Sequence, residues 1–306
     1  MMNTPGESKL WHKQSFKDHV SAYLYLLPFF LIFGIFTLFP VFWSAYISFF
    51  SWDVLGTKKY IGFQNYIWLF TDDPKFWKSV LNTFSIWLMS TLPNLFLALV
   101  LANILNQRFI KGKKLFRLGV IIPNITSLVA VAVIFGSFFG YNYGLINYFL
   151  SELGLDKYDW GASYWGAQFA VAVMVIWRWT GYNAVIYLAA LQSIPADLYE
   201  AARIDGASRT QQFFKITIPM IRPMIIFTVI MSTIGGMQLF VEPLIFSGPT
   251  GGPEGQTLTM VLYLYTEAFT NNNYGYASAI AWMLFLIILL FSMFNNFLTK
   301  KINSAQ

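Results

Sequence analysis

Long apolar segments alternate with short polar ones along most of the chain. The apolar segments cover about residues 22–50, 80–105, 115–139, 167–191, 217–240 and 277–298. Each is long enough to cross a hydrocarbon core of ~30 Å as an α-helix that rises ~1.5 Å per residue. The first segment is too long for the apolar part of a signal peptide, and no small-residue cleavage site is evident. The pattern therefore predicts an all-α integral membrane protein with six transmembrane helices.

The positions of lysine and arginine indicate how these helices are oriented. An even number of spans puts both termini on one side, and cytoplasmic loops carry the excess of positive charge. Five cationic side chains fall on one side, at Lys58, Lys59, Lys75, Lys78 and Lys157. Fourteen fall on the other side, at Lys9, Lys13, Lys17, Arg108, Lys111, Lys113, Lys114, Arg117, Arg203, Arg209, Lys215, Arg222, Lys300 and Lys301. We therefore predict that both termini are cytoplasmic.

The composition agrees with a membrane protein and excludes several kinds of site. Hydrophobic residues make up 57% of the chain and charged residues only 11%, which is unlike an ordinary soluble domain. Cysteine is absent and both histidines, His12 and His19, lie in the N-terminal tail, so we expect no disulfide, metal or other cofactor. The net charge of +6 reflects the loop bias and requires no nucleic-acid partner.

The sequence also lacks the residues that two catalytic functions would need. It contains no Gly-x-x-x-x-Gly-Lys-Ser/Thr run, so the phosphate-binding loop of an ATPase is missing. Serines in the apolar segments have no obvious histidine or basic partner that could activate them as nucleophiles. We therefore predict that the chain is not an enzyme and takes its energy from another source.

A polar segment at residues 195–219 separates two of the most apolar stretches. Pro195 suits the first turn of a helix, and Gly206 can take the left-handed conformation that ends one. Ser208 and Gln211 have the spacing of a capping box for a second helix. The segment therefore predicts a short helix, a glycine turn and another helix.

The first of these short helices has the composition of a contact surface. Ala201 and Ala202 leave a smooth face that another surface could approach closely. Charged side chains fringe this face, at Glu200, Arg203, Asp205 and Arg209. The spacing alone is equally consistent with a solvated connector between two spans.

A family resemblance distinguishes these alternatives. Glu200-Ala201-Ala202, Gly206 and the Ile216 to Pro219 stretch resemble the EAA signature of the membrane subunits of bacterial binding-protein-dependent ABC importers, with Ile218 where leucine is usual. The resemblance covers nearly the whole chain. Further segments are similar to the sugar permeases of the maltose, multiple-sugar and glycerol-phosphate type, namely Gly62-Phe63-Gln64-Asn65-Tyr66, Trp179-Thr180-Gly181-Tyr182-Asn183, Gln192-Ser193-Ile194-Pro195 and Thr250-Gly251-Gly252-Pro253.

The resemblance implies a type I ABC importer permease fold in the bacterial cytoplasmic membrane. In that family the EAA loop forms a cytoplasmic coupling helix that docks in a cleft of the ATPase subunit. The implied partners are a second homologous permease subunit, two ATP-binding subunits and an extracytoplasmic solute-binding protein. The implied ATPase-coupling residues are Glu200, Ala201, Ala202, Asp205, Gly206 and Arg209.

The same interpretation divides the chain into four parts. We expect a cytoplasmic segment at 1–20, a first span with an external aromatic segment at 21–79, a permease core at 80–300 and a cytoplasmic tail at 301–306. The core contains five spans and the EAA loop.

Polar residues inside the fourth and fifth apolar segments predict a substrate pathway. An arginine at the centre of a membrane helix costs ~2.5–3.5 kcal/mol on insertion scales, so Arg178 should face a carboxylate, carbonyls or water. We interpret 177–183 and 235–242 as polar interruptions of two spans, where transporters often bind substrate. The alternative is that Arg178 and Glu242 simply pair and hold two spans together.

A sugar site needs hydrogen-bonding groups for hydroxyls and aromatic faces for the sugar ring. Trp179, Tyr182, Asn183 and Gln238 supply both, and with Arg178 and Glu242 they form the predicted pathway. The resemblance to sugar permeases implies a permease subunit for a disaccharide or oligosaccharide, or a polyol derivative. Importers of phosphate, amino acids and peptides share the EAA loop, so a non-sugar ABC permease is an alternative, as is a stand-alone secondary carrier or channel.

Overall fold

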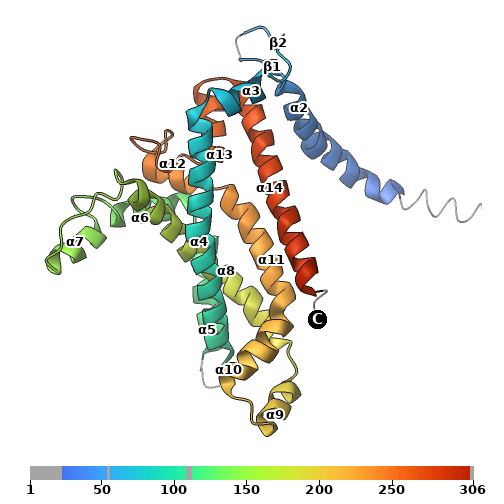
Figure 1. Ribbon diagram of the computed structural model, residues 1–306, viewed down its shortest axis with the longest axis vertical. Helices are drawn as coiled ribbons and strands as arrows, with labels where there is room; N and C mark the ends of the chain where they lie inside the picture. Colours follow the sequence, from blue (N-terminus) through green and yellow to red (C-terminus); the bar gives the residue numbers. More distant parts are fainter. Residues whose placement is uncertain (1–22, 54–55, 108–111, 304–306) are drawn as a thin grey trace, which may run out of the picture.

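The computed structural model describes residues 23–53, 56–107 and 112–303 (Figure 1). The predicted cytoplasmic segment at 1–20, Arg108, Lys111 and the last residues of the predicted tail lie outside this part of the chain. The first helix spans Tyr23–Ile47 and includes the π-helical turn η1 (Gly34–Leu38) and α2 (Phe39–Ile47). The remaining elements, in chain order, are β1 (Phe50–Ser51), β2 (Lys59–Tyr60), α3 (Gln64–Thr71), α4 (Pro74–Asn106), α5 (Lys113–Ile125), α6 (Leu128–Phe138), α7 (Leu145–Glu152), α8 (Tyr164–Gln192), α9 (Ala196–Ile204), α10 (Arg209–Gln212), η2 (Phe213–Thr217), α11 (Ile218–Met237), α12 (Val241–Ser247), α13 (Met260–Tyr265), η3 (Thr266–Thr270) and α14 (Tyr274–Asn303).

Five helices in the described residues are long and apolar enough to cross a membrane. They are Tyr23–Ile47, Pro74–Asn106, Tyr164–Gln192, Arg209–Met237 and Tyr274–Asn295. The count reaches six only if α5 and α6 are taken as one span, because they are bent by 91°.

The span predicted over 115–139 is therefore bent into two helices. Thr126 has an extended backbone with ψ of 146°, and its hydroxyl donates to the Ile122 carbonyl oxygen at 2.7 Å. Such side-chain bonds to the backbone compete with the helical hydrogen-bond ladder. Pro123, which lacks an N–H, further weakens the last turn of α5.

The bundle is formed by long helices that run alongside one another, α4, α8, α11 and α14 (Figure 1). Small residues let two of them approach closely, since Ala98 and Ala102 of α4 and Ala184 of α8 are completely buried in one cluster with Tyr187. This packing positions both candidate sites, because α8 bears Arg178, Trp179 and Tyr182, and α8 and α11 flank the loop that contains α9 and α10.

The predicted interruption of the fourth span at 177–183 does not break the helix, because α8 is continuous from Tyr164 to Gln192. Gly181 instead serves close packing. An ideal Cβ at Gly181 would lie only 1.7 Å from the Val120 carbonyl oxygen of α5. The expected break in the fifth span does occur, since α11 ends at Met237 and α12 begins at Val241.

The end of the bundle opposite α9 and α10 (the outer end) carries the small elements β1, β2, α3 and α13 (Figure 1). The strands pair antiparallel, with Phe50 opposite Tyr60. The first span extends away from this end, and 0% of its apolar window is buried. A helix in the predicted external aromatic segment is confirmed as α3.

Candidate coupling loop and intramembrane polar residues

The helix α9 begins directly after α8, with only residues 193–195 between them. Pro195 occupies the N-cap position with φ of −58° and ψ of 134°, a geometry that directs the chain into a new helix. Asp197 lies in the first turn and Arg203 in the last, each at the end where the helix dipole favours its charge. The predicted start of this helix at Pro195 is therefore confirmed.

The turn after α9 follows from its glycine. Gly206 has φ of +79°, a left-handed conformation that disfavours any side chain with a Cβ. Its N–H donates to the Arg203 carbonyl oxygen at 3.1 Å, and the N–H of Ala207 donates to the Ala202 carbonyl oxygen at 2.8 Å. This pair of bonds is the Schellman arrangement that satisfies the last carbonyls of a helix. Nothing lies within 4 Å of an ideal Cβ at Gly206.

The helix α10 begins with the expected capping box. The Gln211 N–H donates to the Ser208 hydroxyl at 3.2 Å, and the Ser208 N–H donates to Gln211 Oε1 at 2.8 Å. The α9 helix is also tied to the base of α11, because the Tyr199 hydroxyl lies 2.8 Å from Thr217 Oγ1 of η2. The predicted sequence of helix, glycine turn and helix is therefore confirmed.

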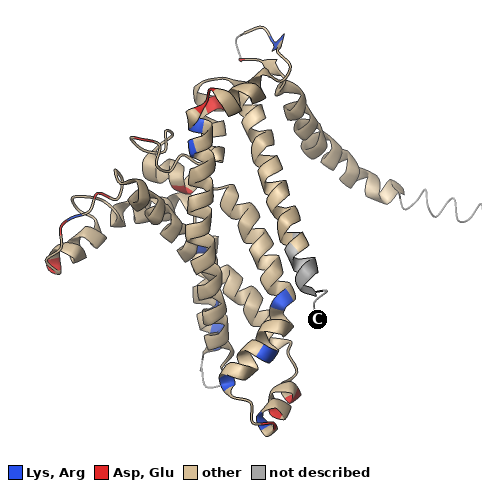
Figure 2. Ribbon diagram, viewed as in Figure 1, with Lys and Arg blue, Asp and Glu red and all other residues tan. Residues whose placement is uncertain are grey.

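The surface of α9 is largely solvent-exposed, and none of its residues is buried. Leu198 is 42% and Ile204 is 87% exposed, although both are strongly apolar. Glu200 and Arg203 form an ion pair at 3.7 Å, and both side chains are more than half exposed. Figure 2 shows charges of both signs gathered around α9 and α10 at this end of the molecule. An exposed apolar surface with a charged rim is typical of a protein interaction site.

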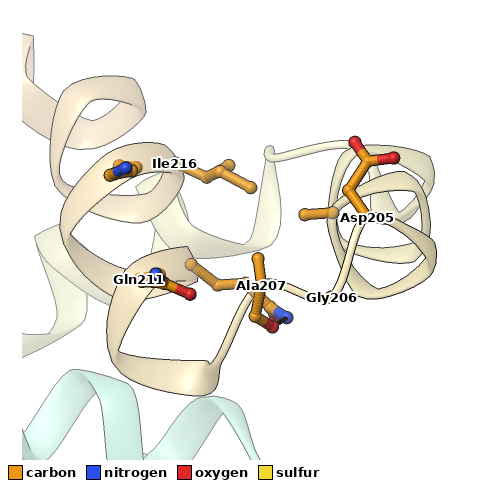
Figure 3. Close-up of a pocket in the computed structure, with 8 residues that line it drawn as sticks. Asp205, Gly206, Ala207, Gln211 and Ile216 are labelled. Atoms are coloured by element: carbon orange, nitrogen blue, oxygen red, sulfur yellow. Dashed lines mark hydrogen bonds between the residues drawn. The ribbon is translucent and has the colours of Figure 1, made fainter.

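A concavity of about 390 Å³ lies between α9 and the η2 turn (Figure 3). In Figure 3, Asp205 lies across it from Gln211 and Ile216, with Gly206 at its edge. Its lining residues are Ala202, Asp205, Gly206, Ala207, Gln211, Gln212, Lys215 and Ile216. The predicted coupling residues Ala202, Asp205 and Gly206 thus share this concavity. Glu200, Ala201 and Arg209 are exposed outside it.

The second group of predicted residues lies where α8 meets α12. Arg178 Nη1 is 4.0 Å from Glu242 Oε1, and the side chains are 20% and 4% exposed. The guanidinium carbon of Arg178 lies 5.5 Å from the centre of the Trp179 ring, a cation–π contact. Among the described residues Arg178 Nε has no hydrogen-bond partner. The predicted ion pair between Arg178 and Glu242 therefore forms, although 4.0 Å is at the long end of the distances that define such pairs.

The other predicted pathway residues separate into two environments. Tyr182 packs edge-to-face on Trp179 with ring centres 5.6 Å apart and is 42% exposed, and Gln238 is exposed between α11 and α12. Asn183 is buried instead, and its Nδ2 donates to Asn94 Oδ1 and to Ser232 Oγ, both at 3.5 Å. The six residues therefore do not line one common surface.

A buried amide network in the outer half was not found from the sequence. Gln168 Nε2 donates to Asn82 Oδ1 at 3.0 Å and to the Gln256 carbonyl oxygen at 2.9 Å, and Asn82 Nδ2 donates to the Gly255 carbonyl oxygen at 2.8 Å. These bonds attach the loop before α13 to α4 and α8. Gly251 in this loop has φ of +73°, a conformation that favours glycine. This explains why a glycine stands at this position of the Thr250-Gly251-Gly252-Pro253 motif.

Comparison with known proteins identifies the architecture. Residues 69–304 match the family model described as binding-protein-dependent transport system inner membrane component. The chain belongs to this family. The permease is therefore a multi-pass membrane protein with a transport role.

Individual relatives align over most of their length. The probable ABC transporter permease protein YesP of Bacillus subtilis (strain 168) is 38% identical over 274 residues, which cover 89% of this permease and 88% of YesP. The lactose transport system permease protein LacF of Rhizobium radiobacter is 34% identical over 285 residues, covering 92% of this permease and 95% of LacF.

A solved structure has the same fold. A chain from the crystal structure of a bacterial alginate ABC transporter, in complex with an alginate-pentasaccharide-bound periplasmic protein, superposes with a TM-score of 0.82 and is 26% identical. The match covers 94% of this permease and 97% of that chain.

Proposed function

We propose that this permease is the membrane-spanning subunit of an ATP-driven, binding-protein-dependent importer of a disaccharide or oligosaccharide. The observation that carries the proposal is the match with LacF, a lactose transport system permease protein, over 92% of this chain and 95% of LacF. The likeness to a chain of an alginate transporter supports a carbohydrate substrate. Translocation would proceed by alternating access, in which the membrane core exchanges between two states.

The energy for this exchange would come through α9. Its exposed apolar side chains and the local turn at Gly206 support a role as a coupling helix that docks on a cytoplasmic ATPase. The α8 helix supports this role, because it runs without a break from Arg178 to Gln192, and only residues 193–195 separate it from α9. The ATPase-coupling residues proposed here are Glu200, Ala201, Ala202, Asp205, Gly206 and Arg209.

The complete importer would contain this chain, a second homologous permease, two ATP-binding subunits and an extracytoplasmic binding protein. A periplasmic protein is part of the alginate transporter structure, which supports the last partner. Both termini would lie in the cytoplasm, because the lysine and arginine excess falls on the side of α9 and α10.

We further propose that substrate passes the exposed face of α8 that bears Trp179 and Tyr182. The two rings are at right angles, and such surfaces suit the apolar faces of sugars. Gln238 would supply hydrogen bonds across the break between α11 and α12. Arg178 and Glu242 would hold α8 and α12 in register beside this face, and Asn183 would support it from inside the bundle.

Reconstitution into proteoliposomes tests the transport mechanism. The account predicts sugar uptake only when the ATPases, the second permease and the binding protein are present with ATP. Uptake driven by an ion gradient with this chain alone would support a secondary carrier and contradict the proposal. A ligand screen of the associated binding protein tests the substrate class separately, since tight binding of an amino acid would overturn the sugar assignment.

A further inference from the structure

The segment Gly62–Tyr66 belongs to neither of the sites described above, although its sequence resembles sugar permeases. It follows β2 and begins α3, and Gly62 makes the turn with φ of +58°. Asn65 is only 3% exposed, even though it lies on a short helix at the outer end of the molecule. A buried asparagine amide requires partners, and here they identify its role.

Asn65 binds the end of the first span. Its Nδ2 donates to the carbonyl oxygens of Ser48 at 2.8 Å and Phe50 at 3.0 Å. Ser48 caps α2, so the amide satisfies a carbonyl group that the helix end leaves without an intrahelical partner. The neighbouring Tyr66 hydroxyl lies 2.8 Å from Ser48 Oγ. Two consecutive residues of α3 thus attach to the same turn.

Two further contacts act on this turn. An ideal Cβ at Gly275, at the start of α14, would lie 1.9 Å from the Phe50 carbonyl oxygen, so the backbones approach as only glycine permits. The Lys58 ammonium group lies 4.8, 4.0 and 4.3 Å from the ring centres of Trp43, Tyr46 and Phe50. This aromatic cage holds the β-hairpin against the last turns of the span.

One turn before Ser48, Trp282 Nε1 of α14 also donates to Ser44 Oγ at 3.2 Å. The apolar window of the first span is 0% buried, and Figure 1 shows the helix leading away from α14 and the bundle. Within the described chain, the contacts that direct it therefore lie in its last turns and in the residues that follow them. We propose that Asn65 is a positioning residue that fixes the angle at which the first span leaves the bundle. This inference does not depend on which substrate the permease carries.

Distance measurements on the full chain in lipid nanodiscs test the inference. The sequence contains no cysteine, so Leu31→Cys and Leu290→Cys introduce the only two labelling sites, and both positions are exposed. The account predicts that Asn65→Leu shifts and broadens the distance distribution between spin labels at these sites. Gln64→Leu, on the exposed neighbour, is the matched control and should leave it unchanged.

A distribution that Asn65→Leu leaves unchanged would overturn the inference. If that variant does not yield folded protein, Asn65→Ala decides the question, because it removes both amide bonds to the Ser48 and Phe50 carbonyl oxygens with a smaller side chain. A shifted or broadened distribution in Asn65→Ala supports the positioning role. The same distribution as the unaltered chain contradicts it.

Discussion

The backbone N–H of Ala207 donates a hydrogen bond to the Ala202 carbonyl oxygen at 2.8 Å, across the turn that ends α9. Gly206 makes this bond possible because its φ of +79° reverses the chain without a steric cost to a side chain. No neighbour occupies the space where a Cβ would lie. The direction of α10 relative to α9 is therefore set by the backbone conformation at Gly206. A partner protein that binds both helices would depend on this glycine.

Glu200→Ala should weaken association with the ATPase only mildly. The Glu200–Arg203 pair is exposed at 3.7 Å, and exposed pairs contribute less than about 1 kcal/mol to stability. The substitution removes a charge beside the proposed docking surface but leaves the turn intact. Thermal unfolding should therefore change little, while co-purification of the ATPase decreases. A large loss of thermal stability would show that Glu200 has a structural role instead.

Gly181→Ala should disturb the packing of α5 on α8. The new Cβ would lie 1.7 Å from the Val120 carbonyl oxygen, and overpacking of this kind costs roughly 1–3 kcal/mol. Gly119→Ala is the matched control on α5, because nothing lies within 4 Å of its Cβ position. Thermal unfolding in detergent should show a loss of stability for Gly181→Ala and no loss of stability for Gly119→Ala. Equal stability of the two variants would contradict the close approach.

Substitutions at Arg178 and Glu242 should distinguish a structural pair from a substrate contact. Arg178→Met leaves Glu242 buried without its cation, and breaking a buried pair costs on the order of 3 kcal/mol. The double variant Arg178→Met/Glu242→Leu removes both charges, so we expect it to recover most of the lost stability. Thermal unfolding of the single and double variants measures this coupling.

Transport by the double variant then separates the two roles. We propose that the pair positions α8 and α12, so the recovered protein should also recover most of its sugar uptake in the assembled importer. Restored stability with no uptake would show that the charges contact substrate. Trp179→Ala is the comparison, because removing a proposed ring contact should reduce uptake while leaving the ion pair in place.

The short elements could be predicted from the sequence because their signals are local. Pro195, Gly206 and the Ser208–Gln211 capping box each act within a few residues, so the pattern specifies both helices and the turn between them. Hydropathy likewise located the long helices, since burial in lipid depends on composition over many residues.

The remaining features depend on contacts distant in sequence. A glycine at 181 can mark either a break or a close approach, and only the position of Val120 distinguishes them. Asn183 pairs with Asn94 and Ser232, which are 89 and 49 residues away. Single polar residues inside apolar segments could have marked these partners. Hydropathy continues across the 91° bend between α5 and α6, so the hydropathy pattern alone could not give its size.

The most direct test of the coupling role compares two glycine variants. Gly206→Val and Gly154→Val both add a β-branched side chain at positive φ, +79° and +73°, where no neighbour lies within 4 Å. The left-handed conformation costs each ~1–2 kcal/mol or more, but only Gly206 lies in the proposed coupling loop.

Both variants should reach the membrane at normal levels, because the spans insert by their own hydropathy. The decisive measurement is the amount of ATPase that co-purifies with each variant, together with substrate-stimulated ATP hydrolysis. We predict that Gly206→Val loses both and that Gly154→Val keeps both. Normal association and normal stimulated hydrolysis in Gly206→Val would show that the loop is only a connector.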